Sequence, residues 1–251
     1  MKREPVSAVV ITLNAERLLD KCLASVAFCD EIVVVDSGST DRTLEIAESH
    51  GARVIHQDWL GYGPQKQFAV EQASHDWVLC IDADEWVSDE LRQSIESFLA
   101  DPKAVAARFP RCNRFLGRWL RHGEGYPDWS LRLFDRRHGQ WSSDAVHEKV
   151  VTEGPMATLT GDLMHESQDT LHEYLEKQNR YTTLQAEAMY REGKQAGVSK
   201  VVLSPFVRFV RFYFLRGGFL DGVPGLVHVL IGCMNSSVKY MKLMERSHAS
   251  D

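Results

Sequence analysis

Short apolar runs recur through the first third of the chain, and polar segments separate them. Four of these runs have the length of strands: Val6–Leu13, Glu31–Val35, Arg53–His56 and Trp77–Ile81. Trp77–Ile81 is apolar at every position, which is typical of a strand buried on both faces of a sheet. The pattern therefore predicts a sheet with Trp77–Ile81 as its central strand.

Between these strands, apolar positions recur at helical spacing. The predicted helices are Ala15–Ala27, Arg42–His50 and Gln65–Ala73. Asn14 is the expected N-cap of the first helix. Thr40 or Asp41 is expected to cap the second helix, and Gly51 to end it. Gly61–Pro64 is expected to be a loop. The alternation predicts a doubly wound, mostly parallel, Rossmann-like α/β sheet.

Polar side chains follow the carboxyl ends of three predicted strands. They are Thr12 and Asn14, Asp36 to Asp41, and Asp82 to Glu85. Ligands of open α/β sheets bind at this edge, so the three groups are expected to meet in one crevice. If the strand continues past Ile81, Asp82 and Asp84 leave it on the same side, where two carboxylates suit Mg²⁺ or Mn²⁺. An acidic turn that closes the strand is the alternative.

The last third of the chain combines helical patterns with basic residues. Thr170 and Glu173 form a capping-box pattern that predicts a helix from Leu171 to about Gly193. Val201–Leu215 mixes aromatic residues with arginines, and a second apolar segment covers Leu226–Met234. A basic amphipathic helix with aromatic side chains fits docking on an anionic membrane surface. Packing against the sheet or against another subunit is the alternative.

Length and charge bound the possible partners. The 251 residues are predicted to divide into a catalytic domain, 1–165, and a helical C-terminal region, 166–251. The formal net charge of −6 argues against a nucleic-acid binder. Basic residues nevertheless gather from Lys103 to Arg137 and from Lys200 to Arg246, so local anionic partners such as diphosphates or lipid headgroups are expected.

The cysteines and the apolar segments indicate the compartment. Five scattered cysteines without a Cys-x-x-Cys pair fit a reducing compartment. Polar residues near the start argue against a signal peptide. No window of about 18 uninterrupted apolar residues exists, so no ordinary membrane-spanning helix is predicted.

Four motifs occur in an order that resembles a known family: Ile11-Thr12-Leu13-Asn14-Ala15-Glu16, Asp36-Ser37-Gly38-Ser39-Thr40-Asp41-Arg42-Thr43, Gly63-Pro64-Gln65-Lys66 and Asp82-Ala83-Asp84-Glu85. They resemble the inverting nucleotide-sugar glycosyltransferases of family 2, which have the GT-A fold. Together with Arg132–Arg137 and Val146–Glu148, they resemble more narrowly the bacterial lipopolysaccharide-core β-1,4-glucosyltransferases. Gln67 departs from that branch, which has Asn there, and is expected to adjust the donor pocket. The resemblance covers nearly the whole chain.

The resemblance implies a UDP-sugar donor site in the crevice. The residues that it assigns to the nucleotide are Thr12, Asn14, Glu16, Asp36, Ser37, Gly38, Lys66 and Asp82. Asp36 would accept a hydrogen bond from uracil, and Asp82 would bond the ribose or the water shell of the metal. Asp84 would bind the metal, Mg²⁺ or Mn²⁺, directly, with His147 and His165 as further candidate ligands. Structural roles are the alternatives: a turn for Asp36, a solvated surface for Glu16 and Lys66.

An inverting transfer also needs one base that takes the proton of the acceptor hydroxyl. In the family this carboxylate follows the Asp-x-Asp, so the candidates are Glu148 first, Asp128 second and Asp144 third. Arginines of Arg132–Arg137 are candidate phosphate clamps. Aromatic residues nearby are candidate sugar-stacking platforms: Trp119, Tyr126, Trp129 and Trp141.

The sequence thus predicts a metal-dependent inverting glycosyltransferase. It would move a hexose, glucose from UDP-glucose, to a lipid-linked core oligosaccharide of lipopolysaccharide, on the inner face of the bacterial cytoplasmic membrane. The helical region would be a membrane-docking or homo-oligomerisation surface. A dehydrogenase, a sugar nucleotidyltransferase and an aspartate phosphatase are disfavoured because their motifs are absent or misplaced. The alternatives are a transferase acting on another cell-envelope glycan and a nucleotide-binding scaffold with little turnover.

Overall fold

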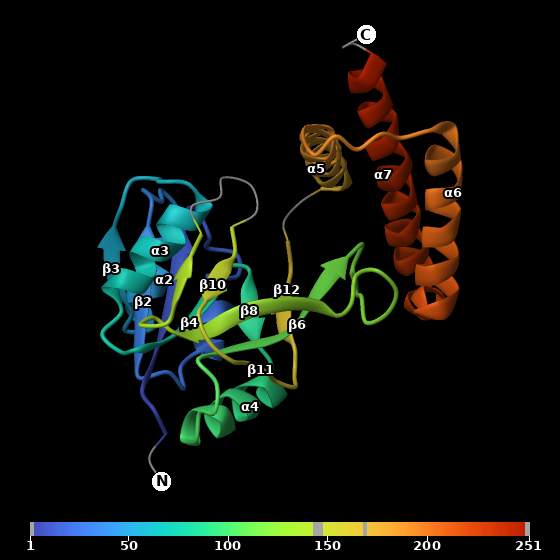
Figure 1. The fold of residues 1–251 in the computed structure, drawn as a ribbon. Coiled ribbons are helices and arrows are strands. Elements are labelled where there is room, and N and C mark those ends of the chain that lie inside the picture. Colours follow the sequence, from blue (N-terminus) through green and yellow to red (C-terminus); the bar gives the residue numbers. More distant parts are fainter. Residues whose placement is uncertain (1–2, 143–147, 168–169, 249–251) are drawn as a thin grey trace. The chain divides into compact units, whose positions relative to one another are not determined.

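The computed structural model describes residues 3–142, 148–167 and 170–248. The chain packs as two compact units. The first comprises Met1–Arg111 and Asp128–Glu166, and the second comprises Cys112–Pro127 and Ser167–Asp251. Figure 1 shows the fold and labels many of its elements. The segment Cys112–Pro127 interrupts the first unit in sequence but belongs to the second unit in space.

A mixed sheet forms the centre of the first unit. Its strand order is β3 (Arg53–His56), β2 (Glu31–Asp36), β1 (Val6–Thr12), β4 (Trp77–Asp82), β8 (Asp128–Asp135), β6 (Ala106–Phe115), β12 (Leu163–His165) and β5 (Glu85–Val87). The first four strands are parallel, whereas β8 is antiparallel to β4 and β6 to β8. Four short strands complete the set: β7 (Arg118–Trp119) and β11 (Met156–Thr158) pair with β6, and β9 (Gly139–Trp141) pairs with β10 (Val150–Thr152).

The four predicted strands are all present, and their register explains the shared edge. Thr12 is the partner of Asp36, and Ile11 is the partner of Asp82, so the carboxyl ends of β1, β2 and β4 lie level with one another. The antiparallel half of the sheet was not predicted. β6 and β8 carry arginines between their apolar residues, so neither shows a continuous apolar run.

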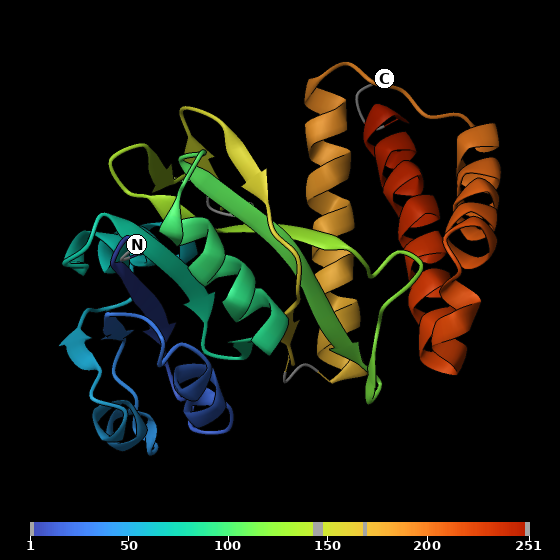
Figure 2. The same cartoon turned by 90° about the horizontal axis from the view of Figure 1, so that it is seen from below.

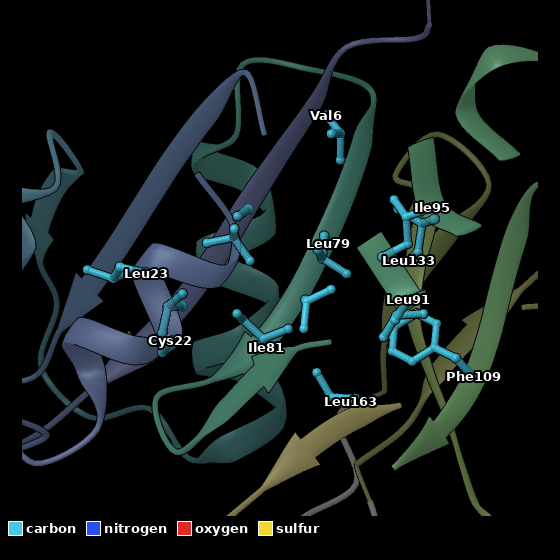
Figure 3. Close-up of a cluster of buried hydrophobic side chains, with 14 of the residues drawn as sticks. Val6, Cys22, Leu23, Leu79, Ile81, Leu91, Ile95, Phe109, Leu133 and Leu163 are labelled. Atoms are coloured by element: carbon cyan, nitrogen blue, oxygen red, sulfur yellow. The ribbon is translucent and has the colours of Figure 1, made fainter. Parts of the chain in front are cut away.

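Helices pack on both faces of this sheet. They are α1 (Leu19–Ser25), α2 (Thr43–Ser49), α3 (Tyr62–Gln72) and α4 (Asp89–Ala100). One core contains Leu79 and Ile81 of β4 together with residues of α1, α2 and α4, as Figure 3 shows in part. The other core contains Val78 and Cys80 of β4 with residues of α3. Because strand side chains alternate, Asp82 leaves β4 on the same face as Cys80, toward α3.

Two predicted helix starts are wrong. Asn14 does not cap a helix, because α1 begins at Leu19 and Asn14 has a left-handed backbone with φ of 50°. Its side-chain oxygen instead accepts a hydrogen bond from the backbone N–H of Thr40. The predicted loop before Gln65 is already helical, since α3 begins at Tyr62 and a helix tolerates Pro64 in its first turn.

Glu31, at the start of β2, ties three segments of the first unit together. Its carboxylate accepts hydrogen bonds from Ser7 Oγ at 2.6 Å, Ser74 N–H at 2.7 Å and Arg53 Nη2 at 2.9 Å. Burial raises the pKa of Glu31, but these hydrogen bonds outweigh it and lower the pKa from 4.5 to about 2. The ionised carboxylate therefore stabilises the fold above about pH 4.5, and this contribution is lost as the pH falls toward 2.

We expect Glu31→Gln to lower the free energy of unfolding by about 2 kcal/mol at neutral pH, because charge-assisted hydrogen bonds are lost. The difference from wild type should shrink as the pH falls from about 5 toward 2. Thermal unfolding across this range measures it, with Glu45→Gln, at an exposed position of α2, as the control. A difference that does not change with pH would contradict the depressed pKa.

The second unit is built from three long helices: α5 (Leu171–Arg191), α6 (Val198–Phe209) and α7 (Gly222–His248). A π-helix, η1 (Val210–Leu215), continues α6, and a 3-10 turn, η2 (Gly218–Asp221), precedes α7. α7 contacts both α5 and α6 and lies between them (Figure 2). The predicted capping box is confirmed, since Thr170 and Glu173 each accept a hydrogen bond from the backbone N–H of the other.

One stretch of this unit, Gly218–Ser247, is long and apolar enough to cross a membrane by length and composition. Scattered polar residues interrupt its apolar runs, so it does not meet the stricter sequence criterion of about 18 uninterrupted apolar residues. Core helices of soluble proteins meet the same two criteria, so length and composition alone do not establish a membrane span.

Candidate active site

The loops that follow β1 and β2 are joined through Asp36. Thr12 Oγ1 donates to Asp36 Oδ1 at 2.8 Å, and Ser39 Oγ donates to the same oxygen at 2.5 Å. Asp36 Oδ2 accepts from the backbone N–H groups of Gly38 at 2.9 Å and Ser39 at 2.8 Å. Gly38 has φ of 95°, a conformation that glycine adopts without strain. This turn holds Ser37 and Gly38 at the sheet edge.

The four bonds leave Asp36 little capacity for a ligand. An ionised carboxylate has about four lone-pair sites, and here four protein donors use them. Burial raises the pKa of Asp36, but the hydrogen bonds from Ser39, Thr12 and Gly38 outweigh it and lower the pKa. The residue is 2% exposed. Base recognition by Asp36 stays a prediction, and the geometry favours a role in shaping the turn.

Asn14 and Glu16 extend the same junction. The Asn14 N–H donates to Ser39 Oγ at 2.8 Å, and Asn14 Oδ1 accepts from the Thr40 N–H at 2.9 Å. Glu16 Oε2 accepts from the Arg42 N–H at 3.1 Å. Both side chains are exposed and bridge the two loops, so the motifs after β1 and β2 form one connected surface.

Lys66 is a buried residue of α3 and not the surface lysine of the alternative interpretation. Its side chain is 8% exposed, and Nζ lies 2.9 Å from Asp82 Oδ1 and 3.6 Å from Glu148 Oε1. Nζ also lies 4.8 Å from the ring centroid of Trp141. The neighbouring Gln65 side chain is fully buried and donates to Ser37 Oγ at 3.0 Å. Helix α3 therefore connects the turn after β2 with the end of β4.

From Asp82 a series of ion pairs runs across the sheet. Arg132 Nη2 lies 2.8 Å from Asp82 Oδ2 and 3.2 Å from Glu85 Oε1. Arg111 Nη1 lies 3.3 Å from Glu85 Oε1, and Arg111 Nε and Nη2 lie 2.9 and 2.7 Å from Asp128 Oδ2. Acids and bases alternate along this ion-pair network: Glu148, Lys66, Asp82, Arg132, Glu85, Arg111 and Asp128. Both leading candidate bases therefore belong to one network.

The residues at the centre of this network keep their charges because oppositely charged partners surround them. Burial raises the pKa of Asp82, but Arg132 and Lys66 outweigh it and hold the pKa well below its usual range. Burial lowers the pKa of Arg132, but Asp82 and Glu85 outweigh it and raise the pKa above its usual value. Glu85 is fully buried. Removing one charge would leave its partners uncompensated.

Asp84 lies in a different environment from Asp82. β4 ends at Asp82, and Ala83 and Asp84 form a turn before β5, so the condition that the strand continues does not hold. The pairing of β5 with β12 brings His165 beside this turn, with Nε2 3.4 Å from Asp84 Oδ2. Among residues 3–142, 148–167 and 170–248, no group of three His, Cys, Asp or Glu side chains could hold a metal ion.

Not every predicted site residue joins this cluster. His147 and Asp144 lie outside the described residues. Arg136 is not at the site, because its Nη1 donates to the carbonyl oxygen of Ala73 after α3, and Arg137 pairs with Asp135. Trp119 and Tyr126 belong to the second unit.

The structure adds to the network two residues for which the sequence predicted no individual role, Glu85 and Arg111. Glu85 was counted among the polar residues after β4, and Arg111 within the basic segment. The sequence contains no local signal that links them, because the paired positions are 26 residues apart.

Comparisons with known proteins agree with this fold. Residues 7–153 match the model of the family described as glycosyl transferase family 2. The chain is 35% identical over 250 residues to the lipopolysaccharide core biosynthesis glycosyltransferase LpsC of Rhizobium meliloti, with 96% of this chain and 93% of LpsC covered. It is 30% identical over 255 residues to an uncharacterized glycosyltransferase of Rickettsia typhi, with 96% and 87% covered.

These matches define a glycosyltransferase. The chain belongs to glycosyl transferase family 2. Among solved structures, its fold is similar to that of S. aureus TarS 1-349 in complex with UDP-GlcNAc, with a TM-score of 0.50, 16% identity, and 98% of this chain and 92% of that chain covered. The predicted GT-A fold class with a helical C-terminal extension is therefore confirmed.

Proposed function

We propose that this glycosyltransferase is metal-dependent and inverting, and that it transfers glucose from UDP-glucose to a lipid-linked core oligosaccharide of lipopolysaccharide. The observation that carries the proposal is the ion-pair network, which joins Asp82, at the carboxyl end of β4, to the candidate base Glu148 through Lys66. The identity to LpsC, which is named for lipopolysaccharide core biosynthesis, supports this acceptor class.

Asp84 and His165 would hold the metal ion. One carboxylate and one imidazole beside each other leave most coordination positions to the donor diphosphate and water, as phosphate-bound metals require. The imidazole favours Mn²⁺ over Mg²⁺, because Mg²⁺ prefers oxygen ligands. When bound, the metal would neutralise the charge that develops on the leaving UDP.

The network residues would position the donor. Asp82 is held ionised by two cations and would accept hydrogen bonds from the ribose hydroxyls. Lys66, which is paired with Asp82, would contact the diphosphate. Thr12, Ser37 and Gly38 would line the base pocket, with Asp36 positioning them through the turn.

Glu148 is the better placed of the two described candidate bases. Its closest described cation is Lys66 at 3.6 Å, a weak contact, and its side chain is 22% exposed. In contrast, Asp128 Oδ2 accepts two short contacts from one guanidinium. Glu148 would take the proton of the acceptor hydroxyl. The acceptor oxygen would then form the new bond to the anomeric carbon while the bond from that carbon to UDP breaks.

The experiment that tests this proposal is a donor panel. The purified enzyme, with Mn²⁺ and a core oligosaccharide-bearing lipid, is given UDP-glucose, UDP-galactose or UDP-GlcNAc, and the products are resolved by mass spectrometry. We expect a mass gain of one hexose with UDP-glucose and inversion to the β-anomer by NMR. Transfer with none of the donors would favour the scaffold alternative, and transfer only to a different glycan would reject the acceptor.

We further propose that the second unit docks peripherally on an anionic cytoplasmic membrane. Apolar side chains of α6 and η1 are unusually exposed: Phe206 by 66%, Val202 by 61% and Leu215 by 79%. The guanidinium groups of Arg211 and Arg216 lie 5.4 and 5.8 Å from the Phe212 ring centroid, beside these residues. Aromatic and aliphatic side chains with adjacent arginines suit an anionic lipid interface.

Vesicle flotation tests this docking. We expect Phe206→Ser with Leu215→Ser to weaken binding to phosphatidylglycerol vesicles by about 10-fold or more, because two exposed apolar side chains that would enter the lipid are lost. Met156→Ser, an exposed apolar residue of the first unit, is the control. Unchanged flotation would contradict membrane docking at this surface. Loss of a dimer with unchanged membrane binding would identify the surface as a homo-oligomer interface instead.

A further inference from the structure

The second unit contains a cavity of about 130 Å³ that none of the roles proposed above uses. By the same measure a single water molecule needs about 10–15 Å³, so the cavity has room for a larger ligand. Its lining includes Gln178 and Gln185 of α5, Arg208 of α6, Asn235 and Lys239 of α7, and Glu124. All these residues belong to the second unit.

The cavity exists because two polar helix faces meet. On α5, Tyr174, Gln178 and Thr182 follow one another at four-residue spacing and line it. On α7 the lining residues also recur at helical spacing: His228, Gly232, Asn235, Ser236 and Lys239. Helices that pack in a soluble protein normally bring apolar stripes together. Here α5 and α7, which run side by side in Figure 2, bring these polar side chains together instead.

A fixed ion pair forms one wall. Arg208 Nε donates to Glu124 Oε2 at 3.0 Å, so this arginine points inward and not toward the surface as the basic amphipathic pattern suggested. A Cβ on Gly232 would lie 2.3 Å from Glu124 Oε2, so glycine is what allows the carboxylate to approach α7. Substituting Gly232 would displace this wall.

The lining is chemically suited to several hydroxyl groups at once. Each amide of Gln178, Gln185 and Asn235 offers both donors and an acceptor, and Asn235 Nδ2 already donates to Gln178 Oε1 at 2.7 Å. Tyr174 and Tyr181 add aromatic surface for the C–H face of a sugar ring. An apolar ligand would cover these amides without offering them hydrogen bonds, which disfavours it.

The charge of the cavity selects among polar ligands. Glu124 and Arg208 neutralise each other, while Lys239 adds one positive charge. Burial lowers the pKa of His228, and the adjacent Arg208 acts in the same direction while Glu124 opposes it, so this histidine is neutral at neutral pH. Lys239, whose Nζ lies 5.0 Å from the ring centroid of Tyr240, is therefore the remaining cation of the described lining.

We propose that this cavity binds a saccharide residue that carries a carboxylate. Amides and the Glu124–Arg208 pair would hold its hydroxyls, and Lys239 would pair with its carboxylate. That this residue is part of the acceptor rests on the proposed function, whereas binding to the cavity does not. The cavity would then select acceptors that contain an acidic sugar near the glycosylated one.

Binding of simple probes to the full-length protein, without donor or metal, tests the proposal. Glucuronate is the acidic sugar, glucose the neutral sugar and acetate the anion without a sugar. Ligand-observed NMR titration should give saturable glucuronate binding that is at least 10-fold tighter than that of glucose or acetate. Hydrogen exchange should show protection in α5 and α7.

Two variants locate the site. Lys239→Met and the milder, exposed Gln185→Leu should each weaken glucuronate binding several-fold, and Lys200→Met on α6, outside the cavity, should not. Glucuronate binding that is absent, equalled by acetate, unchanged in both variants, or displaced by UDP would overturn the proposal. Because no turnover is measured, a negative result here leaves the donor-site proposal unaffected. An enzyme that is inactive but still binds glucuronate would contradict the donor-site proposal and not the cavity proposal.

Discussion

Replacing Glu148 with glutamine is expected to lower the rate of sugar transfer by about 10²–10⁴-fold, the usual contribution of a general base. Glutamine has the same size and keeps an oxygen that can face Lys66, but it cannot take the proton of the acceptor hydroxyl. The affinity for UDP should therefore stay within a few-fold of wild type. Single-turnover transfer and UDP titration on the same preparation separate the two effects.

Asp128→Asn is the matched control for this prediction. Asp128 Oδ2 is already bound by Arg111, so the amide should disturb the ion-pair network without removing a base, and the transfer rate should fall much less. A larger loss in Asp128→Asn than in Glu148→Gln would exchange the two assignments. Equal, small losses in both would mean that neither residue is the base.

Arg132→Met is expected to destabilise the protein by on the order of 3–5 kcal/mol, the cost of removing one partner from a buried ion pair. Arg132 is 6% exposed and bridges Asp82 and the fully buried Glu85. Its loss would leave Glu85 with Arg111 as its remaining cation and Asp82 with Lys66. Chemical denaturation monitored by tryptophan fluorescence measures the effect.

Arg42→Met provides the comparison, because Arg42 pairs with Glu45 on the exposed surface of α2. Such exposed pairs contribute little to stability, so its unfolding midpoint should barely move. If Arg132→Met were as mild as Arg42→Met, water would screen the ion-pair network, and its proposed role in fixing Asp82 would be wrong.

The strands around the site could be predicted from sequence because their side chains alone determine them. Trp77–Ile81 is apolar at every position and is buried as β4. The convergence of Thr12, Asp36 and Asp82 followed from the rule for parallel strands, and the register of β1 with β2 and β4 confirms it.

The different surroundings of Asp82 and Asp84 could not be predicted from their spacing. Their spacing suggested one shared face, but the strand ends between them. Their environments are then set by distant residues: Arg132, 50 positions away, binds Asp82, and His165 reaches Asp84 only through pairing of β12 with β5. Local sequence contains no record of such contacts.

The four hydrogen bonds that Asp36 accepts could not be predicted from the sequence either. The motif that follows β2 suggested a ligand-binding aspartate, and a turn residue was the alternative. Which one holds depends on where the N–H groups of Gly38 and Ser39 point, and that is a property of backbone dihedrals. Glu148, in contrast, could be singled out from the sequence because it belongs to the motif Val146–Glu148. In the structure, α3 brings Lys66 beside it.

Calorimetric titration of UDP, with GDP as the control, tests the donor site most directly. It is run with and without Mn²⁺ on wild type and on Asp84→Asn, a change in the half-buried turn outside the ion-pair network. We predict UDP binding that Mn²⁺ strengthens in wild type, little strengthening in the variant, and no comparable binding of GDP. No UDP binding to wild type under any metal condition, or equal Mn²⁺ dependence in both proteins, would contradict the proposed donor and metal site.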